Sequence, residues 1–365
     1  MKIPLSSPWI TDEDRAAVTQ VLNTPSLALG PVLTEFENYC ASLAGVSHAV
    51  AMSSGTAALT TIARSLEWKE RDEILTPSFS FVASANTIMH VGATPVFVDI
   101  DETSWNMCPK ETEAKLTKNS RGIQAVDIFG LPVEGEVLES LAKKHHLDLV
   151  EDACEAIGAK HQDGRMAGSL GKAGVWAFYP NKQVTTGEGG VLLTNDEGVA
   201  GDCRSKMNQG RDRTGAWFGH QQLGWNHRMS DINAALGLSQ LKRLDAIVEK
   251  RRRVASLYEQ RLKGVAEITL MPDNKRSWFV YVIRLNEAEK RESLMIHLKA
   301  QGIACSNYFV PIHLIPFVQE CCGTKQGQLP KTESLGKSTV ALPFFCELSE
   351  VQVDEVCQAI ISFFG

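Results

Sequence analysis

Lys182 has the clearest chemical potential in the chain, because it lies alone between two apolar stretches. The apolar run 174–179 precedes it, and a second run, 191–193, follows the turn Thr185-Thr-Gly-Glu-Gly-Gly190. A lysine held between two buried strands loses hydration, which disfavours the charged form and leaves a nucleophilic amine. Such amines form Schiff bases with carbonyl compounds, including pyridoxal phosphate. The alternative is an ordinary solvent-exposed loop lysine, the commoner case for a lysine taken alone.

Ser54, Gly55 and Thr56 form a second candidate group, where an apolar run ends and a helical pattern begins. The free N–H groups and the dipole of a helix N-terminus favour a phosphate, and the Thr56 hydroxyl adds a donor. The alternative is a well-capped helix whose glycine only allows a tight turn. These residues alone do not separate the two interpretations.

Asp152 and Glu155 follow a predicted strand, at the carboxyl end where open α/β sheets bind ligands. A carboxylate there could hold a pyridinium N–H, so that the cofactor ring acts as an electron sink. Phe81 follows another predicted strand and could lay its ring over a flat cofactor. The ordinary alternatives are a loop-capping aspartate and a core phenylalanine. The order of phosphate turn, aromatic, strand-end acid and lysine is what a pyridoxal-phosphate site on a parallel sheet requires.

Alternating short strands and helices carry these residues. The predicted strands are 49–52, 73–76, 95–100, 122–127 and 147–151, and the predicted helices between them are 56–66, 80–90, 110–118 and 134–146. Continuous apolar strands separated by helices indicate a mainly parallel sheet covered on both faces. No G-x-G-x-x-G opens any of these helices, so the dinucleotide-binding fingerprint is absent.

The length of 365 residues indicates two domains. We expect a large domain over 1–245 and a small α+β domain over 246–365, with 239–264 as a bridging helix. In the small domain we expect strands at 278–285 and 303–309, a helix at 287–302 and a last helix capped by Ser349 and Gln352. The basic run Lys250-Arg-Arg-Arg253 could meet a phosphate but is more typical of a solvated face, with Glu249 paired to Arg253.

Composition excludes several classes of function. The chain is 44% hydrophobic and 22% charged, as ordinary globular proteins are, and its formal net charge of -6 argues against nucleic acid as a partner. No apolar run approaches the ~20 residues that span a bilayer, and the N-terminus lacks the apolar region of a secretory signal. The nine cysteines contain no C-x-x-C pair, which argues against a disulfide framework and a structural zinc site. We expect a cytoplasmic protein without a metal or membrane partner.

The motifs together resemble those of the DegT/DnrJ/EryC1/StrS family, the sugar-nucleotide aminotransferases of the fold type I pyridoxal-phosphate enzymes. The matches run in order over nearly the whole chain and include Ser54-Gly-Thr-Ala-Ala-Leu59, Pro77-Ser-Phe-Ser-Phe-Val-Ala-Ser84, Glu151-Asp-Ala153, Phe178-Tyr-Pro-Asn-Lys182, Gly187-Glu-Gly-Gly190, Asn208-Gln-Gly-Arg211, Asn226-His-Arg-Met-Ser-Asp-Ile232 and Tyr308-Phe-Val-Pro-Ile-His313. The resemblance implies an α/β, aspartate-aminotransferase-like fold. Its large domain would have a mainly parallel sheet covered by helices, followed by the small C-terminal α+β domain.

The resemblance also implies how a cofactor would be held. Lys182 would form the Schiff base with pyridoxal 5'-phosphate, and Asp152 would pair with the pyridine nitrogen. The remaining cofactor-binding residues would be Ser54, Gly55, Thr56, Phe81 and Glu155. A serine five residues before the lysine often contacts the phosphate in this family, but Ala177 stands here. That contact must therefore be missing or replaced.

Further residues are assigned by the same resemblance to the substrate and the subunit interface. Tyr308, His313 and Arg211 would lie near the sugar nucleotide. Asn226 would reach the cofactor phosphate of the neighbouring subunit, because members of the family are homodimers with shared active sites.

The implied reaction transfers the amino group of L-glutamate to a nucleotide-linked 4-keto-6-deoxyhexose, with pyridoxamine 5'-phosphate present during turnover. Glu155 stands where many members have Gln or His, and it resembles members that form 4-amino-4,6-dideoxyhexoses, such as perosamine synthases. The product would serve the biosynthesis of amino sugars in O-antigens, other polysaccharides or glycosides.

Three alternatives remain at this stage. The first is a 3-keto sugar-nucleotide aminotransferase. The second is a sugar dehydratase of the superfamily, which resembles the same scaffold with a histidine in place of the lysine, so that Lys182 argues against it. The third is a non-catalytic cofactor-binding or regulatory protein, although no added DNA-binding segment appears before or after the predicted fold.

Overall fold

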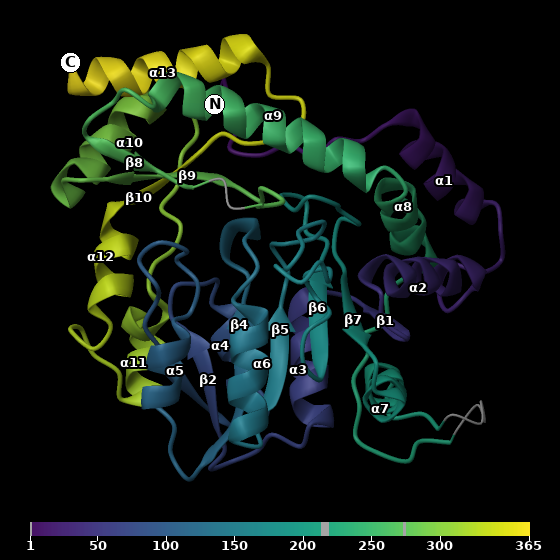
Figure 1. The fold of residues 1–365 in the computed structure, drawn as a ribbon. Helices are drawn as coiled ribbons and strands as arrows, with labels where there is room; N and C mark the ends of the chain where they lie inside the picture. Colours follow the sequence, from purple (N-terminus) through teal and green to yellow (C-terminus); the bar gives the residue numbers. More distant parts are fainter. Residues whose placement is uncertain (1, 213–218, 273–274) are drawn as a thin grey trace.

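A twisted central sheet organises the computed structural model, which describes residues 2–212, 219–272 and 275–365. In these ranges the sheet has seven strands in the order β1-β7-β6-β5-β4-β2-β3 (Figure 1). The strands are β1 (His48–Met52), β2 (Glu73–Pro77), β3 (Thr94–Val98), β4 (Ser120–Val126), β5 (Asp148–Asp152), β6 (Ala173–Ala177) and β7 (Gly190–Thr194). All pairs from β3 to β6 are parallel, and β7 runs antiparallel to both β6 and β1. The mainly parallel sheet is therefore confirmed.

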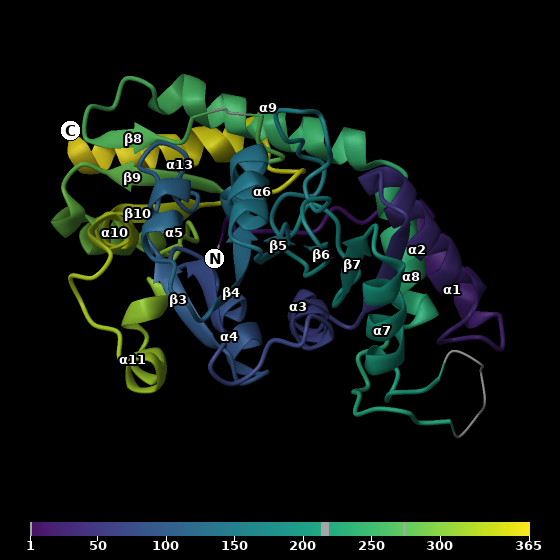
Figure 2. The same ribbon diagram turned by 60° about the horizontal axis from the view of Figure 1, so that its bottom comes forward.

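Helices cover both faces of this sheet, as the apolar strands require. In β7, Leu192 packs into a core with α3 (Gly55–Ser65) and α7 (Glu197–Met207), whereas Val191 and Leu193 pack against α2 (Pro31–Ala44) and α8 (Asp231–Leu241). Figure 2 shows α3 and α4 (Ala83–Met89) on one side of the strands and α6 (Gly135–Lys144) on the other. The short helix α5 (Pro109–Ala114) lies beside α6. Successive residues of a strand face opposite sides of the sheet, and helices cover both sides here. Every residue of β7 is therefore buried.

The N-terminal helices pack on the β1 side of the sheet. α1 (Asp12–Leu22) begins with a capping box, in which the Thr11 N–H donates to Asp14 Oδ2 at 3.0 Å, and it packs against α8. Ser230 caps α8, its Oγ accepting from the Asn233 N–H at 3.2 Å. Asp231 caps α2 instead, since its Oδ1 accepts from the Gly30 N–H at 2.8 Å.

A second, smaller sheet belongs to the C-terminal part of the chain. Among the described residues it contains three antiparallel strands in the order β10-β9-β8: β8 (Ile268–Leu270), β9 (Tyr281–Leu285) and β10 (Thr339–Leu342). The helices around it are α10 (Arg291–Ala300), α11 (Pro316–Cys322), α12 (Pro330–Ser338) and α13 (Glu350–Phe364). The Ser349–Gln352 capping box at the start of α13 is present as predicted.

Two sequence predictions in this part are wrong. Residues 303–309 form no strand, only isolated bridges: Ser306 pairs with Ala341 of β10, the edge strand of the small sheet, and Ile303 pairs with Ile3. The single helix predicted over 239–264 is interrupted, since α8 ends at Leu241 and α9 (Leu244–Leu262) begins three residues later. α9 then runs above the upper edge of the central sheet and packs along α13 (Figure 1). The domain boundary near residue 245 stays a prediction.

No helix in the described ranges has both the length and the apolar character that crossing a membrane requires.

Candidate active site

Lys182 lies on a tight turn between two buried antiparallel strands. β6 ends at Ala177, and the Lys182 N–H then donates to the Tyr179 carbonyl at 2.9 Å. The Thr186 N–H and the Thr185 hydroxyl both donate to the Phe178 carbonyl at 3.0 Å, which returns the chain toward β7. Gly187 has φ +82°, a conformation that favours glycine. This network holds the lysine backbone at the carboxyl end of β6.

The Lys182 amine is enclosed rather than solvated. Its side chain is 13% exposed, and Nζ lies 3.6 Å from Glu155 Oε1. Nζ also lies 4.0 Å from the centre of the Phe279 ring. A carboxyl group on one side and an aromatic face on the other orient the amine. The solvent-exposed alternative for this lysine is therefore wrong.

Glu155 is a buried acid next to that amine. Its Oε2 accepts from the Phe129 N–H at 2.9 Å, and its backbone carbonyl accepts from Gln183 Nε2 at 2.6 Å. Burial raises the pKa of Glu155, and the charge of Lys182 opposes that shift. Glu155 therefore places a buried carboxyl group within ion-pair distance of the Lys182 amine.

Asp152 ends β5 and is anchored by hydroxyl and backbone donors. Its Oδ2 accepts from Ser84 Oγ at 2.8 Å, and its Oδ1 lies 3.3 Å from the Cys154 N–H. Ser84 in turn lies 2.9 Å from the hydroxyl of Ser80. Sequence reasoning placed Ser84 inside a motif but did not recognise it as the residue that orients Asp152. A serine one turn into a helix after a strand end was the available signal.

The start of α3 meets the ends of β6 and β7. Ser54 caps the helix, its Oγ accepting from the Ala57 N–H at 3.0 Å, and Gly55 and Thr56 are the first helical residues. A Cβ atom on Gly55 would lie 2.8 Å from the Ala177 Cβ and 3.0 Å from the Cys154 Sγ. The first N–H groups of a helix have no partner within it, so this turn can accept an anion. The structure thus brings the phosphate turn, the acid strand and the lysine turn together.

Two aromatic residues predicted for the site lie in different surroundings. Phe81 is 60% exposed, which leaves its ring open to a ligand or a partner chain. Tyr308 stacks on Phe309 with ring centres 4.9 Å apart, and it lies parallel to Phe279 at 6.5 Å. Burial raises the pKa of Tyr308. Tyr308 therefore continues the aromatic wall that begins beside the Lys182 amine.

His313 is fully buried rather than open to a ligand. Its Nδ1 lies 2.7 Å from Ser78 Oγ, and its Nε2 lies 3.1 Å from Glu333 Oε1. Burial lowers the pKa of His313, with the carboxylate of Glu333 opposing the shift. Because both ring nitrogens have partners, His313 holds its loop against the end of β2.

Arg211 and Asn226 lie in paired segments beyond α7. Arg211 forms an isolated bridge with His220, and Asn226 forms one with Asn208. The Asn226 residue is exposed, and the neighbouring His227 carbonyl accepts from the Ser53 N–H at 2.7 Å. The Asn226 segment therefore runs beside the phosphate turn of its own chain.

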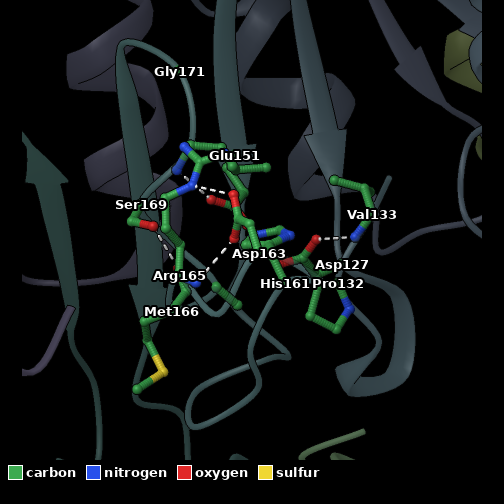
Figure 3. Close-up of polar contacts among 12 residues, drawn as sticks. Asp127, Pro132, Val133, Glu151, His161, Asp163, Arg165, Met166, Ser169 and Gly171 are labelled. Carbon is green, nitrogen blue, oxygen red and sulfur yellow. Dashed lines mark hydrogen bonds and ion pairs between the residues drawn. The ribbon is translucent and has the colours of Figure 1, made fainter. Parts of the chain in front are cut away.

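Asp127, Glu151 and His161 form a buried polar cluster (Figure 3). Glu151 precedes Asp152 in β5, so the two side chains point to opposite faces of the sheet. Glu151 Oε1 lies 2.7 Å from His161 Nε2, and its Oε2 accepts from the Leu170 N–H at 2.8 Å. Burial opposes the charged form of His161, but the hydrogen bond to Glu151, the charges of Glu151 and Asp163 and a backbone hydrogen bond at Val133 together raise the pKa of His161. Burial, followed by the nearby charge of Glu151, raises the pKa of Asp127 well above its ordinary value. Hydrogen bonds from the Leu170 N–H and the Val133 N–H, at 2.8 Å and 2.9 Å, hold the carboxyl groups of Glu151 and Asp127 in place.

Comparison with known proteins agrees with this geometry. The model of the DegT/DnrJ/EryC1/StrS aminotransferase family matches residues 8–361. A GDP-perosamine synthase of Escherichia coli O157:H7 is 33% identical, covering 100% of this chain and 99% of that protein. A UDP-N-acetyl-3-dehydro-alpha-D-glucosamine 3-aminotransferase of Acidithiobacillus ferrooxidans is also 33% identical, over 96% of this chain and 94% of that protein.

Solved structures of similar proteins share the whole fold. PseC of Helicobacter pylori, an aminotransferase of pseudaminic acid biosynthesis, superposes with a TM-score of 0.95 at 29% identity, covering 100% of this chain and 99% of that chain. Spr1654 of Streptococcus pneumoniae, a sugar aminotransferase solved in PLP and PMP forms, superposes with a TM-score of 0.93 at 25% identity, over 99% of this chain and 98% of that chain. With a family model covering nearly the full length and a matching fold, this chain belongs to the DegT/DnrJ/EryC1/StrS aminotransferase family.

Proposed function

We propose that this aminotransferase uses pyridoxal 5'-phosphate to move the amino group of L-glutamate to a nucleotide-linked 4-keto-6-deoxyhexose. The observation that carries the proposal is the enclosed amine of Lys182, with its Nζ 3.6 Å from Glu155 Oε1. Asp152 and the start of α3 converge on the same place. The likeness to the GDP-perosamine synthase supports the 4-keto sugar.

The residues present fit this cofactor. Gly55 and Thr56 offer helix-terminal N–H groups for the phosphate, and the exposed ring of Phe81 offers a stacking surface. The Asp152 carboxylate, anchored by the hydroxyl of Ser84, suits a ring N–H. Missing side chains at Gly55 and Gly190 leave the backbone of the phosphate turn open, since a Cβ on Gly190 would lie 2.5 Å from the Gly55 nitrogen.

Lys182, Asp152 and Glu155 each have a defined role in this proposal. The bound cofactor supplies a carbonyl carbon that accepts the amino group and an electron-withdrawing ring. Lys182 would hold the cofactor through its amine and would carry a proton to and from the substrate carbon. Asp152 would hold the proton on the ring nitrogen, which would stabilise developing negative charge electrostatically. Glu155, whose pKa is raised by burial, would hold or return a proton next to Lys182.

The remaining assignments belong to this proposal. Tyr308, Arg211 and His313 are proposed to form or support the sugar-nucleotide side, with His313 acting through its contacts to Ser78 and Glu333. Asn226 is proposed to contact the cofactor phosphate of a partner in a cytoplasmic homodimer, and its exposure is compatible with that role.

The direct test is incubation with L-glutamate and a panel of nucleotide-linked 4-keto and 3-keto sugars, read by mass spectrometry. We expect amination of the 4-keto sugars, with 2-oxoglutarate formed in equal amount. The Lys182→Ala variant is the matched control, and full turnover by that variant would refute the assignment of Lys182.

Amination of 3-keto sugars is the second candidate, favoured by the likeness to the UDP-N-acetyl-3-dehydro-alpha-D-glucosamine 3-aminotransferase. Exclusive formation of 3-amino products in the same panel would select it. A cofactor absorbance that L-glutamate leaves unchanged would instead indicate a binding protein without transaminase activity.

A further inference from the structure

Arg251 is a buried cation inside the basic run of α9. It is 3% exposed, and its Nη2 donates to the backbone carbonyl of Lys182 at 3.0 Å. Its Nη1 donates to the carbonyls of Trp278 at 3.2 Å and Phe279 at 3.1 Å. One guanidinium therefore joins the lysine turn to the segment that carries the Phe279 ring.

Arg252 and Arg253 lie on a solvated face, as the sequence predicted for this run, but Arg251 is buried. Lys250 Nζ pairs with Glu347 at 2.6 Å, and Arg252 Nη1 pairs with Glu249 at 2.6 Å, both near the surface. In the described part of the chain, Arg251 has no carboxylate within salt-bridge distance. The run is therefore not a uniformly solvated face, and Glu249 pairs with Arg252 rather than with Arg253.

A buried guanidinium without a carboxylate is expensive to maintain. Desolvation of an isolated cation costs several kcal/mol in real proteins, and hydrogen bonds to neutral carbonyls recover only part of that cost. Burial lowers the pKa of Arg251, because desolvation disfavours the charged guanidinium. A methionine would fill the space between α9 and the sheet without this cost, so packing alone does not account for an arginine here.

We propose that Arg251 is a positioning residue that sets the place of the Lys182 amine. It holds the lysine at both ends: directly at the Lys182 carbonyl, and indirectly at Nζ through Phe279, whose ring centre lies 4.0 Å from Nζ. The inference rests on the proposed catalytic role of Lys182.

A second link shows that the two segments are joined on both sides. Gln183 Nε2 donates to Ser277 Oγ at 2.9 Å and to the Glu155 carbonyl at 2.6 Å. Two side chains thus connect the 277–279 segment to the lysine turn: Gln183 through Ser277, and Arg251 through the carbonyls of Trp278 and Phe279. Gln183 sits on the turn itself, whereas Arg251 comes from α9. Displacement of α9 would therefore move the lysine backbone and the Phe279 ring together.

The test compares Arg251→Lys and Arg251→Met with Arg252→Met as the matched control on the same helix. Arg251→Lys keeps the charge, but a single ammonium group cannot reproduce the planar fork that spans the carbonyls of Lys182 and Phe279. The Arg252→Met variant loses only a surface ion pair, which contributes little. Thermal unfolding of all three proteins shows which variants fold.

The first measurement is hydrogen exchange of the cofactor-free protein, read on a peptide covering residues 179–186. We expect exchange in this peptide to be about ten-fold faster or more in Arg251→Lys than in the wild type, in line with the loss of a hydrogen bond to a charged group. Arg252→Met should leave it unchanged. Exchange at the wild-type rate in a folded Arg251 variant would overturn the inference.

The second measurement is steady-state turnover. Because Arg251 contacts the backbone carbonyl of Lys182 rather than its amine, kcat should fall about ten-fold or more while the KM for L-glutamate stays within about two-fold. An unchanged kcat, or an equal loss in Arg252→Met, would also overturn the inference. Failure of the proposed function is recognised separately, since the wild-type protein would then show no turnover, whereas the exchange measurement on the cofactor-free protein does not depend on turnover.

Discussion

The contact between Gly55 and Ala177 allows a quantitative test of the phosphate turn. A Cβ added at Gly55 would lie 2.8 Å from the Ala177 Cβ, and both atoms are fixed to backbone, so no side-chain rotation relieves the clash. Overpacking of this kind typically costs about 1–3 kcal/mol. The backbone of Gly55 has no positive φ, and Gly→Ala in such a position gains about 0.4–1 kcal/mol through the unfolded chain. We expect Gly55→Ala to lower the free energy of unfolding by about 1–2 kcal/mol.

Ala177→Gly supplies the matched partner variant, because it removes the atom that the new Cβ meets. Alone, it should cost about 0.5–1 kcal/mol, as expected for glycine in a strand. In the double variant the clash is relieved, so the combined loss should be smaller than the sum of the single losses by about 1 kcal/mol or more. Urea unfolding of the four cofactor-free proteins, with cofactor titration alongside, provides the measurement.

The cofactor titration separates the site from general stability. Gly55→Ala should weaken cofactor binding, because the turn must shift away from Ala177, and the double variant should recover part of the affinity. Strictly additive losses in unfolding free energy, or unchanged affinity in Gly55→Ala, would refute the reasoning that Gly55 is required for close approach to β6.

Three further changes test neighbouring parts of the site. Ala177→Ser adds a hydroxyl beside the phosphate turn. We expect cofactor dissociation to slow about ten-fold, because a hydrogen bond to a charged group contributes about that much. No change in the dissociation rate would show that residue 177 does not face the phosphate. Ser84→Ala removes the hydroxyl that donates to Asp152 Oδ2 at 2.8 Å. Cofactor affinity, measured by titration, should fall about ten-fold. An affinity equal to that of the wild type would contradict the role of Ser84 in anchoring Asp152. Burial raises the pKa of Glu155 above the ordinary value of 4.5, so its carboxyl contributes stability at low pH that is lost as the pH rises through the raised pKa. Urea unfolding of the cofactor-free protein should therefore show Glu155→Gln gaining stability relative to the wild type as the pH rises from 4.5, and parallel pH profiles would contradict the raised pKa.

Local signals were sufficient for much of the fold. The apolar runs, the Ser54 and Ser349 caps and the glycine-rich turn after Lys182 act over a few residues, so the strands and helix starts around the site could be predicted. The predicted strand over 303–309 failed for the opposite reason: strand formation depends on continuous pairing with a partner, and this segment meets β10 only at the Ser306–Ala341 bridge.

The amino-acid sequence was sufficient to predict Lys182, Asp152 and the turn at Gly55 as candidate site residues, because strand ends, helix starts and their residue types are local properties. The surroundings of these residues depend on the tertiary structure. It buried His313 between Ser78 and Glu333, and it turned Arg251 from an apparent surface cation into a partner of the Lys182 carbonyl. Contacts between residues tens to hundreds of positions apart depend on how helices and sheets pack, and no short pattern in the chain encodes them.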